Sequence, residues 1–129
     1  MQDSIFAKIV RREIPADIVY EDDISLAFLD INPVALGHTL LIPKEPYVWM
    51  DDVPDELLGA MFMRTKKLMR VMKKVLPCDF IQVSVVGKDV PYFHIHLIPR
   101  YMDDRLPNSP TVNYASMEEK EIFLRKIRS

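Results

Sequence analysis

The sequence predicts an α+β fold in which five antiparallel strands form one sheet, with one long helix and one or two short helices. Two observations support this expectation. The apolar segments with strand periodicity come in pairs joined by short turns, as in hairpins rather than regular βαβ units. One long segment instead repeats its apolar residues at helical spacing. Because the chain has only 129 residues and shows no internal repeat, we expect residues 1–129 to form a single domain.

The first half of the chain is expected to hold a short helix and three strands. Ser4 is suited to cap a helix that ends before Ile14-Pro15, because the residue before proline disfavours helical geometry. Turn-forming residues then separate the apolar runs into strands. The expected elements are a helix at residues 4–10, a hairpin of strands 17–21 and 25–29, a loop at 30–37 and a strand at 38–43.

The second half is expected to begin with the longest helix. Proline is favoured at a first helical position, so this helix should start near Pro54 and end before Pro77. Its many lysines and arginines indicate a solvated face rather than a nucleic-acid site. Two strands should follow at residues 80–86 and 92–98, joined by a short turn at 87–89. Ser116 and Glu119 form a capping-box pattern that predicts a last helix, to about residue 127.

Composition excludes several classes of protein. A net charge of −2 does not indicate a strongly basic or acidic partner. The single cysteine, Cys78, excludes an internal disulfide and fits a reducing compartment. No apolar run approaches the ~20 residues of a membrane span, and residues 1–12 lack the apolar core of a signal peptide. We therefore expect a cytoplasmic protein without nucleic-acid or membrane partners. Three glycines are too few for a glycine-rich phosphate loop.

The histidines are the strongest candidates for a functional site. The chain has three, His38, His94 and His96, and strand alternation would place the last two on one face with Tyr92, about 7 Å apart. Residues 93, 95 and 97 would then point into the core. This spacing fits a solvated sheet face, a metal site that needs a further ligand, or nucleophilic and acid–base catalysis. Spacing alone slightly favours the first interpretation.

The order of several motifs resembles the histidine-triad (HIT) family of nucleotide-binding proteins. The name-giving triad of that family falls on Tyr92, His94 and His96 and closes with residues 98–100. The similarity covers about residues 4–101, and we expect the segment 102–129 to be a carboxy-terminal extension that contains the last helix. The other matching stretches are residues 4–10, 13–16, 19–23, 27–33 and 37–44.

The resemblance implies roles for the histidines. His94 matches the nucleophile, which attacks the α-phosphorus of a nucleotide and forms a nucleotidyl-histidine that water hydrolyses. His96 would donate to the phosphate oxygens, and His38 would set the hydrogen bonding beside the triad. Attack needs a neutral imidazole, and a histidine with an ordinary pKa of about 6.5 is mostly neutral at pH 7. The alternative for His38 is a buried structural histidine.

The resemblance also implies a nucleotide pocket. Asp30 would accept hydrogen bonds from both ribose hydroxyls, although it also fits ordinary turn chemistry. The apolar walls would hold a flat base but discriminate only weakly between adenine and guanine, and their phenylalanines would fit an ordinary core equally well. Lys88, Asp89 and Tyr92 match positions near the phosphate or leaving group. The residues that match the apolar walls are Ile5, Phe6, Ile9, Phe28 and Ile31.

Three departures from the family pattern modify these expectations. Tyr92 replaces the first triad histidine, and we expect its phenol to keep a link to His38 and to alter rather than abolish activity. Asp89 would repel a phosphate unless it points away or pairs with Lys88. Ser4 and Ala7 occupy positions where some relatives carry zinc-binding cysteines, so we expect no metal there, and no cofactor.

The resemblance implies an enzyme of the purine nucleoside phosphoramidase-like branch, which cleaves P–N bonds in nucleoside 5′-phosphoramidates. A dinucleoside polyphosphate hydrolase, and a weakly active nucleotide-binding or scaffolding protein, are the alternatives, and a metal-binding module is the least favoured. The family also implies a homodimer in which two five-stranded sheets join into one of ten strands.

Overall fold

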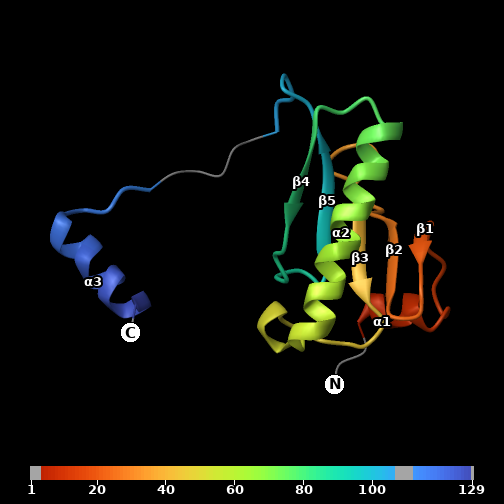
Figure 1. Cartoon of the computed structure of the whole chain (residues 1–129), viewed down its shortest axis with the longest axis horizontal. Helices are drawn as coiled ribbons and strands as arrows, with labels where there is room; N and C mark the ends of the chain where they lie inside the picture. Colours follow the sequence, from red (N-terminus) through yellow and green to blue (C-terminus); the bar gives the residue numbers. More distant parts are fainter. Residues whose placement is uncertain (1–3, 107–111, 129) are drawn as a thin grey trace.

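The structure is a computed structural model that describes residues 4–106 and 112–128. As predicted, five strands form one antiparallel sheet, in the order β1-β2-β3-β5-β4 (Figure 1). The hairpin of the first two strands is also confirmed. The strands are β1 (Ile18–Glu21), β2 (Ser25–Leu29), β3 (Thr39–Pro43), β4 (Phe80–Ser84) and β5 (Ile95–Arg100).

The short first helix, α1 (Ile5–Val10), covers one face of the sheet. The Ser4 hydroxyl accepts a hydrogen bond from the Ala7 N–H at 3.1 Å, so Ser4 caps this helix as predicted. Phe6 and Ile9 of α1 are buried in one apolar cluster with alternate strand residues, namely Leu26 and Phe28 of β2 and Leu40 and Ile42 of β3. These contacts fix α1 beside the end of β2.

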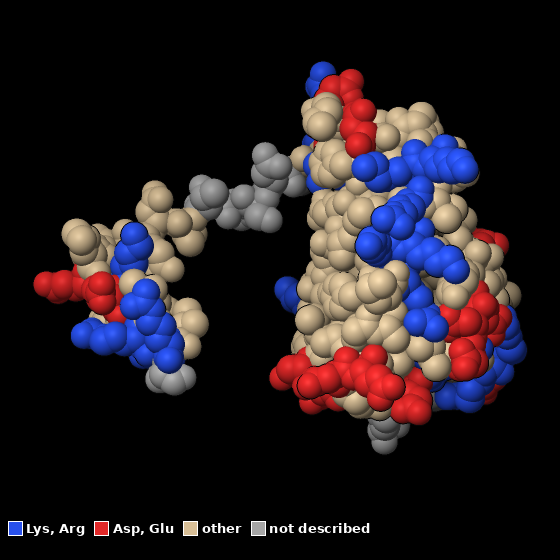
Figure 2. All heavy atoms as spheres, in the orientation of Figure 1, with Lys and Arg blue, Asp and Glu red and all other residues tan. Residues whose placement is uncertain are grey.

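The long helix, α2 (Asp55–Val75), covers the opposite face. Met61, Leu68 and Met72 pack in a second cluster with Leu41 and Leu97. Because neighbouring residues of a strand point to opposite faces, the division of β3 between the two clusters places α1 and α2 on different sides of the sheet. The lysines and arginines of α2 gather on its outer side, the expected solvated face (Figure 2).

The connection between β4 and β5 is longer than the sequence predicts. β4 ends at Ser84 and β5 starts at Ile95, so the expected strand over residues 92–94 and the short turn at 87–89 are wrong. The Phe93 N–H donates to the Tyr47 carbonyl at 2.5 Å, in the connector that precedes α2, instead of continuing the ladder. Gly87 has a φ of 76°, a left-handed conformation that favours glycine. The chain therefore enters β5 through a loop whose conformation is fixed by the contact with Tyr47 and by Gly87.

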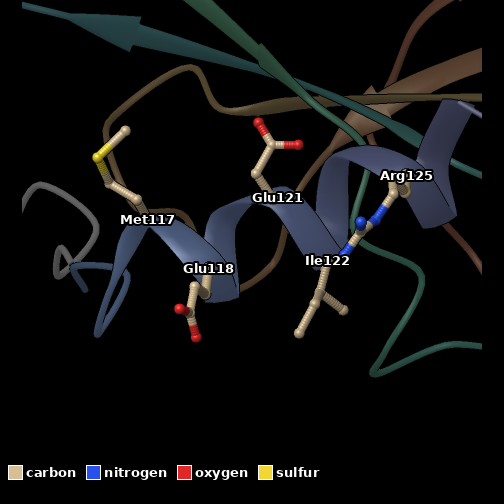
Figure 3. Close-up of a pocket in the computed structure, with 5 residues that line it drawn as sticks. All are labelled: Met117, Glu118, Glu121, Ile122 and Arg125. Carbon is tan, nitrogen blue, oxygen red and sulfur yellow. The ribbon is translucent and has the colours of Figure 1, made fainter.

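The last helix, α3 (Met117–Arg128), starts at the predicted capping box. The Glu119 N–H donates to the Ser116 hydroxyl at 3.1 Å. No α3 side chain that the structure describes is buried, and the helix lies away from the sheet in Figure 1. A shallow hollow on α3 is lined only by residues of this helix, as Figure 3 shows, so it does not constitute a site between elements. None of the helices in the described part of the chain has the length and hydropathy of a membrane-spanning segment.

Candidate active site

A cavity of about 630 Å³ opens beside α1 and contains all three histidines. This volume is within the range of small-molecule sites. Its lining comes from three parts of the chain: α1 with the loop that follows it, the segment from β2 to β3, and the loop that enters β5. The lining residues are Ile5, Phe6, Ile9, Ile14, Pro15, Ala16, Asp17, Phe28, Leu29, Asp30, Ile31, Asn32, Val34, His38, Leu40, Asp89, Val90, His94 and His96.

His94 is the buried histidine immediately before β5. Its Nδ1 lies 2.6 Å from the carbonyl oxygen of Tyr92, an atom that can only accept a hydrogen bond. The proton of a neutral His94 ring therefore lies on Nδ1, and Nε2 keeps its lone pair. The ring of Phe6 packs edge-on against the imidazole, with the ring centres 5.0 Å apart. His94 is thus held in the tautomer that presents Nε2 as a nucleophile.

His38 and His96 form a hydrogen-bonded pair, and in both rings the proton lies on Nε2, whereas in His94 it lies on Nδ1. The backbone N–H of Val34 donates to His38 Nδ1 at 3.1 Å, so the proton of a neutral His38 lies on Nε2. That Nε2 is 2.9 Å from His96 Nδ1 and donates to it. The proton of a neutral His96 therefore lies on Nε2. The rings of His94 and His96 have centres 4.8 Å apart, closer than the strand spacing predicts.

The pKa values of the pair favour neutral rings. Burial lowers the pKa of His38 from its ordinary 6.5, and the charge of Asp30 opposes that shift only in part. Burial also lowers the pKa of His96 to about 4, and repulsion from His94 and His38 acts in the same direction. Neutral rings are what the hydrogen-bond chain from Val34 to His96 requires.

Asp30 lies at the end of β2 and uses its two carboxylate oxygens differently. Oδ1 accepts from the Asn32 N–H at 2.9 Å, which is the turn chemistry that the sequence allows. Oδ2 lies 3.6 Å from His38 Nε2, and Asp30 is one of the residues that line the cavity. The turn therefore orients Asp30, and one of its oxygens is left to meet a ligand.

Asp30, His38 and His96 also offer three potential metal-ligand atoms within 4.8 Å of one another. A nitrogen must give up its proton to coordinate a metal, however. The Nε2 of His38 carries a proton as long as the Val34 N–H donates to Nδ1. The donor set therefore fits a hydrogen-bond relay better than a cation site.

The apolar side chains that match the family's base pocket line one continuous wall. Phe6 and Phe28 are buried and meet edge-to-face, with ring centres 5.5 Å apart, and both also belong to the core cluster of α1. The two phenylalanine rings are thus part of the hydrophobic core and also form part of the cavity wall. Ile5 and Ile31 are exposed at the rim, Ile31 by 80%. A flat aromatic ligand would cover them.

Tyr92 does not face the cavity. Its side chain is 1% exposed, packs against Phe6, and donates from its hydroxyl to the Pro43 carbonyl at 2.5 Å. The expected link from the phenol to His38 is therefore wrong, because Tyr92 precedes β5 and does not share the orientation of His94. Burial raises the pKa of this phenol far above its usual value. Tyr92 supports the site from behind, through its carbonyl on His94 and its packing against Phe6.

The loop before β5 brings Asp89 but not Lys88 to the cavity, so a pair of these residues facing a phosphate is not observed. Sequence reasoning assigned no role to several other lining residues. Residues 14–16 belong to a matched stretch, and Asn32 follows Asp30 in another, so their positions carried a signal. No feature of the sequence indicated that Asp17 would line the cavity, because an acidic residue at the start of an exposed strand is usually solvated.

Comparisons with known proteins identify the family of this chain. The profile of the HIT domain family matches residues 11–103. An uncharacterised HIT-like protein of Methanocaldococcus jannaschii is 45% identical over 104 residues, which cover 78% of this chain and 81% of that protein. The adenosine 5′-monophosphoramidase HNT1 of Saccharomyces cerevisiae is 39% identical over 101 residues, which cover 74% of this chain and 61% of the yeast protein.

Solved structures share the fold over almost the whole chain. The crystal structure of a HIT family member from Bacillus subtilis superposes with a TM-score of 0.85 at 30% sequence identity, covering 98% of this chain and 96% of the other. The match therefore includes the sheet and the segments that surround the cavity. The sequence profile, the identities and the shared architecture establish that the protein belongs to the HIT family.

Proposed function

We propose that the protein is a hydrolase of purine nucleoside 5′-phosphoramidates that acts at the α-phosphorus through a nucleotidyl intermediate on His94. The observation that carries this proposal is the opposite placement of protons on two neighbouring rings. His94 presents an unprotonated Nε2, and His96 presents an Nε2–H. A nucleophile beside a hydrogen-bond donor is what displacement at a phosphorus needs.

The cavity supplies places for the three parts of a nucleotide. The base fits between the aromatic and aliphatic side chains around Phe6 and Phe28. The free Oδ2 of Asp30 is suited to accept hydrogen bonds from ribose hydroxyls. The α-phosphate would then lie against His94 and His96. The yeast relative named adenosine 5′-monophosphoramidase supports this substrate class.

The proposed reaction has two steps. In the first, His94 Nε2 bonds to the α-phosphorus, the P–N bond breaks, and the departing amine takes a proton from solvent. The Nε2–H of His96 donates a hydrogen bond to a phosphoryl oxygen and stabilises the charge that develops there. In the second step, water attacks the phosphorus, the bond to His94 breaks, and the water releases a proton. The products are an amine and a nucleoside monophosphate, and no metal or cofactor takes part.

The test is AMP release from adenosine 5′-phosphoramidate by the purified protein, without added metal. We expect His94→Ala to lower the rate by about a thousandfold or more, because the nucleophile is lost. Tyr114→Phe, an exposed change on another part of the chain, is the control and should behave as the wild type. Mass spectrometry after an alkaline quench should find an adenylyl group on the wild type but not on His94→Ala. Unchanged release by His94→Ala would contradict the mechanism.

Asp89 favours a second candidate function. Its carboxylate lines the cavity near His96, whose pKa burial lowers, and the charge of Asp89 opposes that lowering only in part. A negative charge beside the phosphate would weaken binding and slow turnover. A nucleotide-binding protein with little hydrolysis would bind AMP and release none from the phosphoramidate. Release that rises in Asp89→Asn would instead show that Asp89 restrains an active enzyme.

We also propose that the protein is a homodimer in which the β4 edges of two sheets pair. β4 lies at one edge of the sheet. Large apolar side chains are exposed on β4 and directly after it: Phe80, Val85 and Val86. A free strand edge with such side chains is suited to pairing with a second copy.

A further inference from the structure

One polar side chain of the cavity, that of Asp17, comes from a different segment than the histidines. The other polar lining residues all come from the segment 30–38 or from the loop and strand at 89–96. Asp17 comes from the loop between α1 and β1, and the neighbouring lining residues Ile14, Pro15 and Ala16 are apolar. This carboxylate has no role in the proposed chemistry, but it lines the cavity and is placed to contact a bound ligand.

The position of Asp17 follows from the pairing of β1 with β2. The Leu29 N–H donates to the Asp17 carbonyl at 3.0 Å, and Leu29 directly precedes Asp30. Neighbouring strands lie about 4.8 Å apart. Asp17 is therefore one strand away from the carboxylate assigned to the ribose, a separation that a nucleoside can span. With the ribose at Asp30 and the phosphate at the histidines, Asp17 lies where the edge of the base would be.

The Asp17 carboxylate is available to a ligand. Its side chain is exposed, and it makes no hydrogen bond or ion pair with residues 4–106 or 112–128. Asp22, which lies five positions further, is by contrast held by Arg64, Tyr20 and Ser25. Nothing in the described part of the chain would have to be displaced for Asp17 to accept hydrogen bonds.

We propose that Asp17 makes the site prefer guanine over adenine nucleotides, an inference that rests on the proposed nucleotide-binding function. A carboxylate has two acceptor oxygens, and guanine presents two adjacent donors, N1–H and the N2 amino group. Adenine presents one amino group beside the N1 acceptor, whose lone pair would face the carboxylate. The apolar walls hold either purine, so Asp17 is the group that discriminates between them.

The test compares the dissociation constants of GMP, IMP and AMP by calorimetry, with the full chain. GMP should bind about fivefold more tightly than AMP, a modest ratio because the carboxylate is exposed to water. IMP keeps N1–H but lacks the amino group, so its affinity should fall between the two. Asp17→Ala should bring the three affinities within about twofold by weakening GMP. Asp51→Ala removes the same charge at an exposed position outside the cavity and should leave the GMP preference intact.

Equal affinity of the wild type for GMP and AMP would overturn the proposal, and so would a GMP preference that persists in Asp17→Ala. Both results leave the site as a purine nucleotide site, so they do not touch the proposed function. Failure of all three nucleotides to bind to the wild type would overturn the proposed function together with this inference.

Discussion

Two backbone groups determine which histidine nitrogens carry protons in this site. The Tyr92 carbonyl requires a proton on His94 Nδ1, and the Val34 N–H excludes one from His38 Nδ1. Backbone groups cannot change their role as donor or acceptor. The proposed nucleophile and the proposed donor are therefore specified by the path of the main chain, so a tyrosine at position 92 leaves both arrangements in place.

Tyr92→Phe tests this separation of backbone and side-chain roles. The change keeps the carbonyl on His94 but removes the buried hydrogen bond from the phenol to Pro43. We expect the free energy of unfolding to fall by about 1–2 kcal/mol, because the Pro43 oxygen loses its partner in the interior. Phosphoramidase kcat/KM should stay within about threefold of the wild type. A large loss of activity at unchanged stability, measured by urea unfolding, would refute this view of Tyr92.

The lowered pKa of His96 predicts how stability depends on pH. An unfolded histidine takes up a proton near pH 6.5, whereas folded His96 does so only near pH 4. Between these values the unfolded state holds more protons, so the free energy of unfolding decreases as the pH falls, by about 2 kcal/mol from this residue. Urea unfolding at pH 7, 5.5 and 4.5 should show the decrease, and it should be smaller in His96→Asn. Identical pH profiles for the two proteins would exclude His96 as the cause.

At the scale of elements, the local sequence was sufficient to predict a helix wherever a capping residue or proline at its end agreed with the periodicity of its apolar residues. The Ser4 cap, the long helix after Pro54 and the Ser116–Glu119 capping box all appear where they were predicted. Each signal involves residues a few positions apart. Such contacts are visible in a sequence because no other part of the chain is needed to form them.

The approach to β5 was mispredicted because its pattern is ambiguous. Tyr92, Phe93 and His94 continue the alternation of β5, so residues 92–98 read as one strand. The structure instead bonds the Phe93 N–H to Tyr47, a contact between distant segments that no local pattern contains. The orientation of Tyr92 depends on that contact. Asp17 was missed for a related reason, because only the pairing of β1 with β2 brings it beside Asp30.

At the scale of the whole molecule, the sheet has two edges, and they are not equivalent. The edge strand β1 carries charged contacts from Glu21 to Lys44 and Arg12. Such ion pairs make an edge less suited to pairing with another chain. At the other edge, Phe80, Val85 and Val86 are exposed on β4 and just beyond it. The asymmetry indicates that a second copy would join at β4.

The dimer proposed for this edge can be tested by mass. Light scattering after size exclusion should give about 30 kDa, twice the 15.1 kDa of one chain. Val86→Lys places a charge beside the pairing edge and should shift the protein toward 15.1 kDa, because a lysine at an edge opposes the approach of another strand. Val19→Lys makes the same change on β1 and should leave the dimer intact. A wild-type mass of one chain, or dissociation by Val19→Lys alone, would show that β4 is not the interface. The loop that follows β4 brings Asp89 to the cavity. Pairing of two copies at β4 would restrict the movement of this loop. Val86→Lys should therefore change phosphoramidase activity as well as mass.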